Sequence, residues 1–158
     1  MKSLKRADLT ALSAKAAAAP RLRAHWNGHE ALSDPIQRLA IAMEPGTYVR
    51  PHRHPHTFEM LLPLSGAFDL IQFDEHGTVT ARHRLGRDGL AVCEQQPGSW
   101  HSVIALDPGS VIFEVKHGPY APLAADNLAS WSPAEGEPAV PAMLEFLAHA
   151  VVGDRFNG

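Results

Sequence analysis

One stretch carries the strongest structural information in the chain: Gly46-Thr-Tyr-Val-Arg-Pro-His52-Arg-His54-Pro-His-Thr-Phe-Glu59-Met-Leu-Leu-Pro-Leu-Ser-Gly66. Side chains alternate between the two faces of a β-strand, so His52 and His54 are expected on the same face. A turn after His54 would let Glu59 return towards both histidines on the next strand. Imidazole nitrogen and carboxylate oxygen are ligands of first-row transition metals. The stretch therefore predicts two neighbouring strands that together supply three metal ligands.

A second piece, Pro97-Gly98-Ser99-Trp100-His101, follows about forty residues later in the chain and offers a fourth ligand, His101. Any one of the four side chains alone would be an ordinary polar group on a barrel rim. All four together, at this spacing, favour metal ligation. His56 shares the strand parity of His52 and His54, but the preceding proline and the nearby turn favour a position on the rim.

The composition restricts the class of protein. A chain of 158 residues is large enough to bury one core without disulfides, and its lone cysteine, Cys93, fits a reducing compartment. The net charge of −3 offers no general attraction to nucleic acid or to anionic membranes. No apolar stretch reaches the length of a membrane span, and polar residues interrupt the alanine-rich start. We expect a cytoplasmic protein.

The pattern along the chain predicts an all-β jelly roll with a short helix at each end. Residues 1–20 suit a helix, and residues 21–35 read as a polar connector. Residues 36–115 break into short runs at Gly and Pro, and the last helix is expected at Pro141–Val152. The expected strands are Ile36–Met43, Tyr48–His54, Phe58–Pro63, Ala67–Phe73, Val79–Leu85, Leu90–Gln95, His101–Leu106 and Val111–Val115.

We divide the chain into residues 1–20, a barrel with its connector at 21–120, and a tail at 121–158, all within one domain. A homodimer is expected, because jelly rolls often protect their sheet edges by pairing.

The same residues resemble the cupin superfamily. Its first motif places a glycine, H-x-H, a glutamate and a second glycine at the spacing found in Gly46, His52, His54, Glu59 and Gly66. In the second motif, Gly98 and His101 keep the G-x-x-H part. Pro97 stands directly before the glycine rather than two residues before it, and Ala105 replaces the usual asparagine. The resemblance implies a double-stranded β-helix barrel that binds one divalent metal ion through His52, His54, Glu59 and His101.

A narrower resemblance, to the WbuC family of cupin-fold metalloproteins, covers about Ala7 to Glu137. It is carried by Arg23-Ala-His-Trp-Asn27-Gly-His29, Pro35-Ile-Gln-Arg38-Leu, Glu44-Pro-Gly-Thr-Tyr-Val-Arg-Pro-His-Arg-His54, Phe73-Asp-Glu-His-Gly77, Phe113-Glu-Val-Lys-His-Gly-Pro-Tyr120 and Trp131-Ser-Pro-Ala-Glu135. Members of that family are associated with bacterial O-antigen (lipopolysaccharide) and surface-polysaccharide gene clusters. The resemblance implies a role in that biosynthesis and leaves the reaction open.

Further residues are candidates for contact with a small molecule. Arg50 has the parity that would point it into the cavity, where it could bind a carboxylate or phosphate. Glu114 and Lys116 share one face of the last strand, and periodicity alone favours a solvated face for them. Segments shared with the WbuC family add further candidates, for which capping of the barrel is the competing role. The substrate-binding candidates are thus Arg23, Asn27, Arg38, Arg50 and Lys116, and the acid–base candidates are His29, Glu114 and Tyr120.

Three functions fit these residues. The first is a metal-dependent isomerase or epimerase acting on a sugar or sugar-nucleotide intermediate. The second is an Fe(II)-dependent dioxygenase, and the third is a non-catalytic, metal-dependent carbohydrate-binding module. The ligand set accepts Fe, Ni, Zn, Mn or Co.

Overall fold

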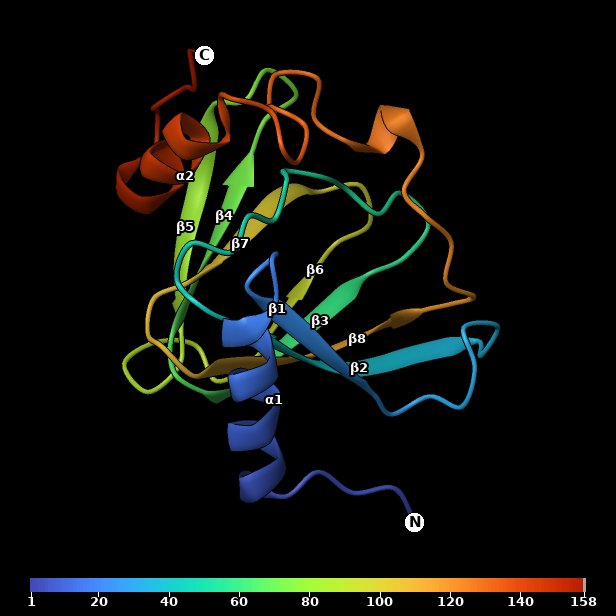
Figure 1. The fold of residues 1–158 in the computed structure, drawn as a ribbon. Helices are drawn as coiled ribbons and strands as arrows, with labels where there is room; N and C mark the ends of the chain where they lie inside the picture. The colour runs from blue at the N-terminus through green and yellow to red at the C-terminus, as the bar shows by residue number, and fades with distance from the viewer. Residues whose placement is uncertain (158) are drawn as a thin grey trace.

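The computed structural model describes residues 1–157 and consists of two antiparallel sheets with a helix near each end of the chain (Figure 1). The helices are α1 (Arg6–Ala18) and α2 (Val140–His149), with a short 3-10 helix, η1 (Ala125–Asn127), between the last strand and α2. The strands are β1 (Arg23–Asn27), β2 (Ile36–Met43), β3 (Glu59–Ser65), β4 (Phe68–Phe73), β5 (Val79–Leu85), β6 (Cys93–Gln95), β7 (Trp100–Ala105) and β8 (Ser110–His117).

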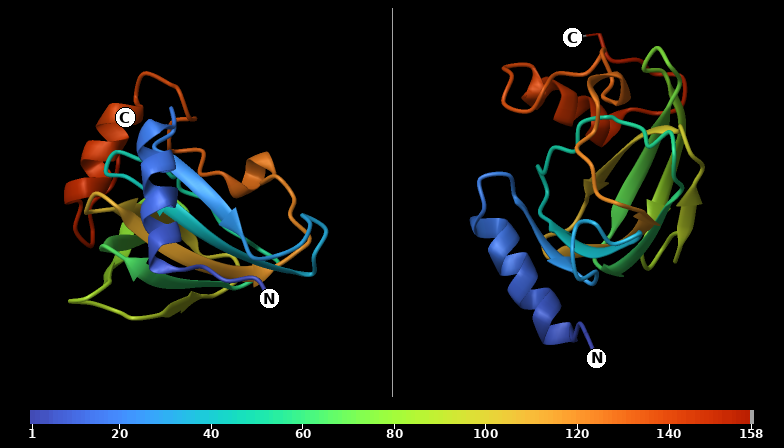
Figure 2. Two further views of the ribbon diagram at one scale, coloured as in Figure 1. Left: turned by 60° about the horizontal axis from the view of Figure 1, so that its bottom comes forward. Right: turned by 90° about the vertical axis from the view of Figure 1, so that its right-hand side faces the viewer.

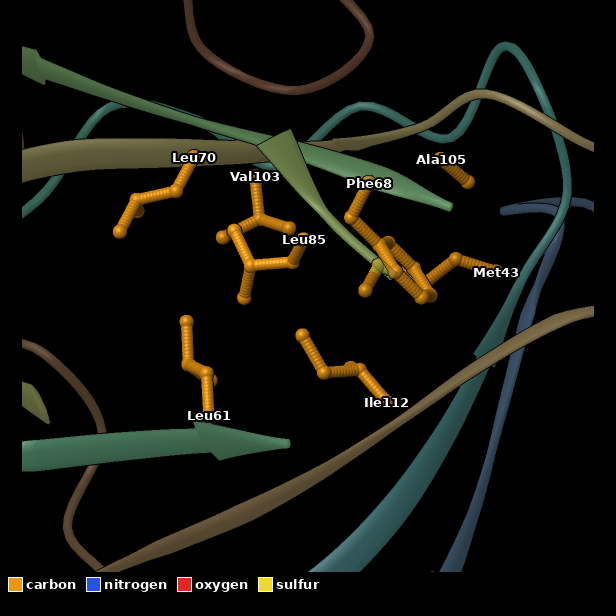
Figure 3. Close-up of a cluster of buried hydrophobic side chains, with 8 residues drawn as sticks. All are labelled: Met43, Leu61, Phe68, Leu70, Leu85, Val103, Ala105 and Ile112. Carbon is orange, nitrogen blue, oxygen red and sulfur yellow. The ribbon is translucent and has the colours of Figure 1, made fainter. Parts of the chain in front are cut away.

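The first sheet has the strand order β1-β2-β8-β3-β6, and the second has the order β5-β4-β7. The inner faces of the two sheets share one apolar core, in which side chains from both sheets point towards each other (Figure 3). The larger sheet contributes Met43, Leu61 and Ile112. The smaller sheet contributes Phe68, Leu70, Leu85, Val103 and Ala105. This core fills one end of the space between the sheets and leaves the other end for the site described below.

The outer face of each sheet is also covered, by one helix each (Figures 1 and 2). Leu12 and Ala16 of α1 pack on Ala40, Ala42 and Val111 of the larger sheet. Met143, Leu147 and the following Ala150 pack on the smaller sheet, against Ile71, Phe73, Val79 and Ile104. Because both faces are covered, the central strands carry apolar residues at consecutive positions, such as Val111 and Ile112 on β8. Within residues 1–157, neither helix has the length and apolar composition of a membrane-spanning segment.

The structure confirms the predicted all-β jelly-roll class with terminal helices, arranged as two facing sheets. Strands β2 and β5 have the predicted bounds. The described residues form no ladder that closes the sheets into one continuous barrel, so the predicted barrel is more open than expected. The terminal helices are somewhat shorter than predicted, and only the last three residues of the run Leu90–Gln95 form a strand.

Two other predictions about strands were wrong. The expected strand Tyr48–His54 is extended chain with isolated β-bridges at His52 alone, to His101 and to Leu128, because its backbone finds partners in different elements of the described residues. His52 pairs with β7, whereas the Arg53 N–H donates to the Asn127 carbonyl and the Pro51 carbonyl accepts from Ala129. The connector at 21–35, in turn, contains β1, which pairs antiparallel with β2. Because one expected strand is absent and β1 is additional, the described residues form as many strands as the sequence predicted.

Candidate metal centre

Four side chains converge between the two sheets: His52, His54, Glu59 and His101. One potential ligand atom from each lies within 4.8 Å of the others. Glu59 is the first residue of β3 in the larger sheet, and His101 is the second residue of β7 in the smaller sheet. His52 and His54 come from the extended segment before β3. The cluster is well shielded, since His54, Glu59 and His101 are 9, 4 and 2% exposed. The four residues brought together are those that the sequence predicts as metal ligands.

Two imidazole rings are oriented by backbone carbonyl groups. His52 Nδ1 lies 2.9 Å from the Arg50 carbonyl oxygen, and His101 Nδ1 lies 3.0 Å from that of Ser99. A carbonyl oxygen can only accept a hydrogen bond, so each Nδ1 carries the proton and donates it. In the neutral ring, Nε2 is then left with a free lone pair. Nδ1–H held by a carbonyl is the usual support for a metal-binding histidine.

Within residues 1–157, His101 Nε2 is a buried atom without a hydrogen bond of good geometry. It lies 2.9 Å from Glu59 Oε2, so the two atoms are close but poorly directed towards each other. A buried nitrogen without a well-directed hydrogen bond destabilises the fold unless another group binds it. The donor set and this unsatisfied atom both fit a divalent metal ion.

The Glu59 carboxylate contacts a different pair of groups through each oxygen. Oε1 lies 3.3 Å from both His54 Nε2 and Lys116 Nζ. Oε2 lies close to His101 Nε2 and accepts a hydrogen bond of 3.2 Å from Gln95 Nε2. Burial alone would raise the pKa of Glu59, but His101, His54 and Lys116 together hold it well below its ordinary value. Glu59 is therefore a carboxylate at neutral pH, the form that binds a metal.

The histidines differ in their tendency to take up a proton. Burial, with a smaller contribution from the neighbouring His101, lowers the pKa of His52 to about 3. Burial also lowers the pKa of His54. Burial opposes the charged form of His101 as well, but the adjacent Glu59 carboxylate outweighs it and raises the pKa of His101. His52 is thus neutral at neutral pH, with its Nε2 free to bind a metal.

Periodicity alone favoured a solvated face of β8 for Lys116 and Glu114. In the structure, both lie beside this cluster. Glu114 is 8% exposed, and its Oε1 lies 2.6 Å from Lys116 Nζ. Burial raises the pKa of Glu114, and the nearby Glu59 adds to that effect. Burial alone would lower the pKa of Lys116, but Glu114 and Glu59 raise it. The charged pair faces inwards because α1 covers the opposite face of β8, where Val111 is buried.

A cavity of about 960 Å³ lies against the cluster and extends across the inner face of the larger sheet. The register of this sheet places directly opposite residues in rows that cross the strands. One row runs Gln37, Lys116, Glu59 and Gln95, and the next runs Asn27, Leu39, Glu114, Leu61 and Cys93. Because neighbouring strands lie about 4.8 Å apart, the three steps from β3 to β1 span roughly 14 Å. The cavity has room for a small organic molecule beside the cluster.

The other predicted site residues have different positions. Arg23, Asn27, His29, Arg50 and Tyr120 border the cavity, whereas Arg38 lies outside its lining. The Arg38 guanidinium pairs with Asp34 at 3.0 Å. Arg50 donates hydrogen bonds to the Ala129 and Ser132 carbonyls and to Ser132 Oγ, so it holds the tail beside the cavity. His56 is exposed and lies outside the four-residue cluster.

Sequence reasoning missed two residues of the site. His25 lies on β1 and lines the cavity, and burial, with help from Arg21 and Lys116, lowers its pKa. Its alternation with Arg23 and Asn27 was the available signal, because those three residues share one strand face. Gln95 on β6 is 3% exposed and contacts Glu59. Gln95 is recognised as a site residue only from the pairing of β6 with β3, and the sequence does not reveal that pairing.

Comparisons with known proteins place the fold. Residues 4–85 match the family model described as a domain of unknown function, DUF6016. The chain resembles the structure of KdgF from Halomonas sp., with 16% identity and a TM-score of 0.51, over 65% of this chain and 84% of KdgF. It also resembles the conserved SPY1581 protein of unknown function from Streptococcus pyogenes, with 14% identity and a TM-score of 0.52, over 77% and 93% of the two chains.

A weaker likeness links the chain to a sugar phosphate isomerase from a cupin superfamily, SPO2919 of Silicibacter pomeroyi. That match has 18% identity and a TM-score of 0.49, and covers 61% of this chain and 59% of the other. A comparison with curated proteins finds no match. At these identities KdgF and SPY1581, the two neighbours with TM-scores above 0.5, show a likeness of fold alone. Because the family model covers more than half of the chain, the protein belongs to the DUF6016 family.

Proposed function

We propose that the protein binds one divalent transition metal ion through His52, His54, Glu59 and His101. The observation that carries this proposal is the convergence of their ligand atoms within 4.8 Å between the two sheets. The carbonyl contacts of His52 and His101 and the unsatisfied Nε2 of His101 support it. Three imidazoles and one carboxylate suit Fe, Ni, Zn, Mn or Co.

We propose further that the bound ion acts on a small polar molecule held in the adjacent cavity. With positions open to a ligand, such an ion polarises a carbonyl group or activates water. A sugar or a sugar-nucleotide intermediate of O-antigen synthesis is the substrate class we favour. The resemblance to the WbuC family supports that class, and so does a cavity that combines polar groups with apolar Leu39 and Ile41.

Residues of the cavity wall would orient such a ligand. Asn27 and Tyr120 can bind hydroxyl groups, and the cationic groups of Arg23 and Lys116 can bind a phosphate or carboxylate. Arg38 is a weaker candidate because it lies outside the cavity lining, and Arg50 is weaker because it donates three hydrogen bonds to the tail. His29, Glu114 and Tyr120 remain the candidates for moving a proton.

The test is metal analysis of protein purified without added metal, comparing wild type with His54→Ala and Glu59→Ala. We expect close to one ion per chain in wild type and a large loss in both variants. His56→Ala is the matched control, since it removes an imidazole two residues from His54 that is exposed and outside the cluster. Unchanged metal content in His54→Ala and Glu59→Ala would exclude this ligand set.

The same preparation distinguishes the possible activities. Turnover of a nucleotide-sugar without oxygen uptake supports the isomerase or epimerase, whereas stoichiometric oxygen uptake with Fe(II) supports the dioxygenase. Stoichiometric zinc with ligand binding and no turnover supports a binding module. A cytoplasmic location, indicated by the lone Cys93, and a homodimer complete the proposal. Light scattering of the purified protein tests the dimer.

A further inference from the structure

The Glu59 carboxylate stands between two polar side chains from the neighbouring strands. Register places Lys116 of β8 opposite it on one side and Gln95 of β6 opposite it on the other. Directly opposite residues of adjacent strands project to the same face, so all three side chains reach one region of the cavity. Lys116 contacts Oε1 at 3.3 Å, and Gln95 donates to Oε2 at 3.2 Å.

Lys116 reaches a second residue of the cluster, because its Nζ lies 3.3 Å from His54 Nε2. The ammonium therefore contacts atoms of Glu59 and His54 that would also bind a metal ion. A cation at this position supplies positive charge to a buried carboxylate, as a metal ion would. Two cations that need the same oxygen and nitrogen compete for them, and they repel each other at short range.

We propose that Lys116 is an internal counter-ion that competes with the metal ion for Glu59 and His54, and that Glu114 and Gln95 favour metal binding. The inference rests on the proposed metal site. Glu114 Oε1 lies 2.6 Å from Lys116 Nζ, nearer than either cluster residue. Glu114 therefore neutralises the ammonium when a metal ion takes over the charge of Glu59, and it lowers the cost of releasing Lys116 from the cluster.

Gln95, like Glu114, favours metal binding, but for a different reason. Its amide nitrogen is the part of the side chain that can donate to a carboxylate, so the amide orientation is determined by Glu59. Gln95 is 3% exposed, and its Oε1 is buried with no hydrogen-bond partner in the described part of the chain. The hydrogen bond to Oε2 restrains the carboxylate without adding a positive charge near a metal ion. Gln95 is therefore a positioning residue for Glu59 and not a competitor.

The experiment measures the Co(II) dissociation constant by chelator competition, together with the visible absorption spectrum of the Co(II) protein, at one fixed neutral pH. We expect Lys116→Met to tighten Co(II) binding by about tenfold, because a competing cation is removed. Gln95→Met should weaken binding by roughly 10- to 100-fold, as loss of a supporting hydrogen bond to a ligand typically does, and should alter the spectrum. Glu114→Gln should also weaken binding, because it leaves Lys116 with Glu59 and His54 as its remaining partners.

Two controls have the same chemical changes at exposed positions. Gln96→Met is one residue from Gln95, and Lys15→Met lies on the outer helix α1. Neither should change Co(II) affinity. A double-mutant cycle separates positioning from general stability: in a Glu59→Gln background, Gln95→Met should cause little further loss. Full additivity of the two losses would show that Gln95 acts through the fold and not through Glu59.

Lys116→Met leaves Glu59 and Glu114 without their cation, so metal-free protein can fail to fold. The double variant Lys116→Met with Glu114→Gln removes one positive and one negative charge and keeps the test decisive. It should bind Co(II) more tightly than Glu114→Gln alone. Weaker or equal binding, here or in a folded Lys116→Met, overturns the competition. The metal site itself fails separately, if wild type does not take up one Co(II) or if Glu59→Gln leaves its affinity unchanged.

Discussion

His52 and His101 are joined through their backbones before their side chains meet. The His52 N–H donates to the His101 carbonyl at 3.0 Å, and the His101 N–H donates to the His52 carbonyl at 2.9 Å. This isolated bridge ties the extended segment before β3 to β7 of the smaller sheet. Their imidazole centres are consequently 4.4 Å apart. The fold thus sets the separation of two proposed ligands without help from a metal ion.

Replacing His52 by alanine should abolish stoichiometric metal binding with little loss of folding stability. Alanine keeps both backbone hydrogen bonds of the bridge, and the space left by the ring opens on the cavity, where water can enter. Metal analysis and urea unfolding of chelator-treated protein check this together. A variant that retains one ion per chain would contradict the role of His52. Unfolding would show instead that the ring is needed for the fold.

Metal-free protein should lose stability as the pH falls below about 6.5. The folded-state pKa of His52 is lowered to about 3 and that of His54 is also lowered, so unfolded chains, with an ordinary value of 6.5, bind more protons. Their contribution is fully present above pH 6.5 and decreases as the pH falls towards 3. Among the histidines only His101 acts in the opposite sense within the described residues, since its raised pKa stabilises the folded state at low pH, whereas the lowered pKa of His25 adds to the effect of His52 and His54.

Urea unfolding of chelator-treated protein at several pH values checks that sign. The His52→Ala variant, which lacks the group with the lowest pKa, should show a shallower loss of stability on acidification than wild type. If the free energy of unfolding fell equally steeply with pH in the two proteins, His52 would have an ordinary pKa in the folded state.

The ligand cluster could be predicted from the sequence because its evidence is local. His52, His54 and Glu59 lie within eight residues, and His101 stands in a short motif of its own. From the sequence, His52 and His54 were expected on one face of a β-strand. That expectation was wrong, because the two histidines do not lie on a regular strand. The segment is extended on account of separate partners in β7 and the tail, and this extension also points both rings at Glu59.

The cavity wall depends on pairings that sequence patterns do not reveal. Strand β1 was read as a connector because of its polar residues Arg23, His25 and Asn27, although these alternate with Ala24 and Trp26. The inward direction of Glu114 depends on α1 covering the other face of β8, a contact between segments about one hundred residues apart. Gln95 becomes part of the site only through the register of β6 on β3. Such long-range contacts explain why the four-residue cluster was predicted, whereas Gln95 was missed and a solvated face was favoured for Glu114 and Lys116.

Gly66→Ala should destabilise the protein much more than Gly136→Ala. Both glycines have positive φ angles, +68° and +89°, so each alanine meets a similar backbone strain. A Cβ at Gly66 would lie 2.1 Å from Ser110 Oγ and 2.9 Å from Ser110 Cα, whereas a Cβ at Gly136 meets nothing within 4 Å. We expect about 1–2 kcal/mol at Gly136 from strain alone. Overpacking should add about 1–3 kcal/mol at Gly66.

Urea unfolding of the two glycine variants gives the comparison directly. Similar losses of stability would show that Ser110 moves aside at little cost and that close packing does not select glycine at position 66.

Arg82→Leu should release α2 from the smaller sheet, and Arg84→Leu should not. Both arginines pair with Asp69, which is 3% exposed. Arg82 also donates to the carbonyl oxygens of Leu147, Ala148 and Ala150, at distances of 2.8 to 3.0 Å. These carbonyls end the helix and lack partners within it, and a cation is favourable at that end. Arg84 has a half-exposed side chain, 51% accessible, and contacts Asp69 alone among these groups.

Removal of Arg82 should therefore cost about 3 kcal/mol, as expected when one partner of a buried ion pair is lost. Removal of Arg84 should cost about 1 kcal/mol or less, because its ion pair is partly screened by solvent. Hydrogen exchange gives the sharper measurement: amides of residues 140–150 should exchange faster in Arg82→Leu and at the wild-type rate in Arg84→Leu. Equal protection of α2 in the two variants would mean that Met143 and Leu147 hold the helix by apolar packing alone, since both side chains are fully buried against the smaller sheet.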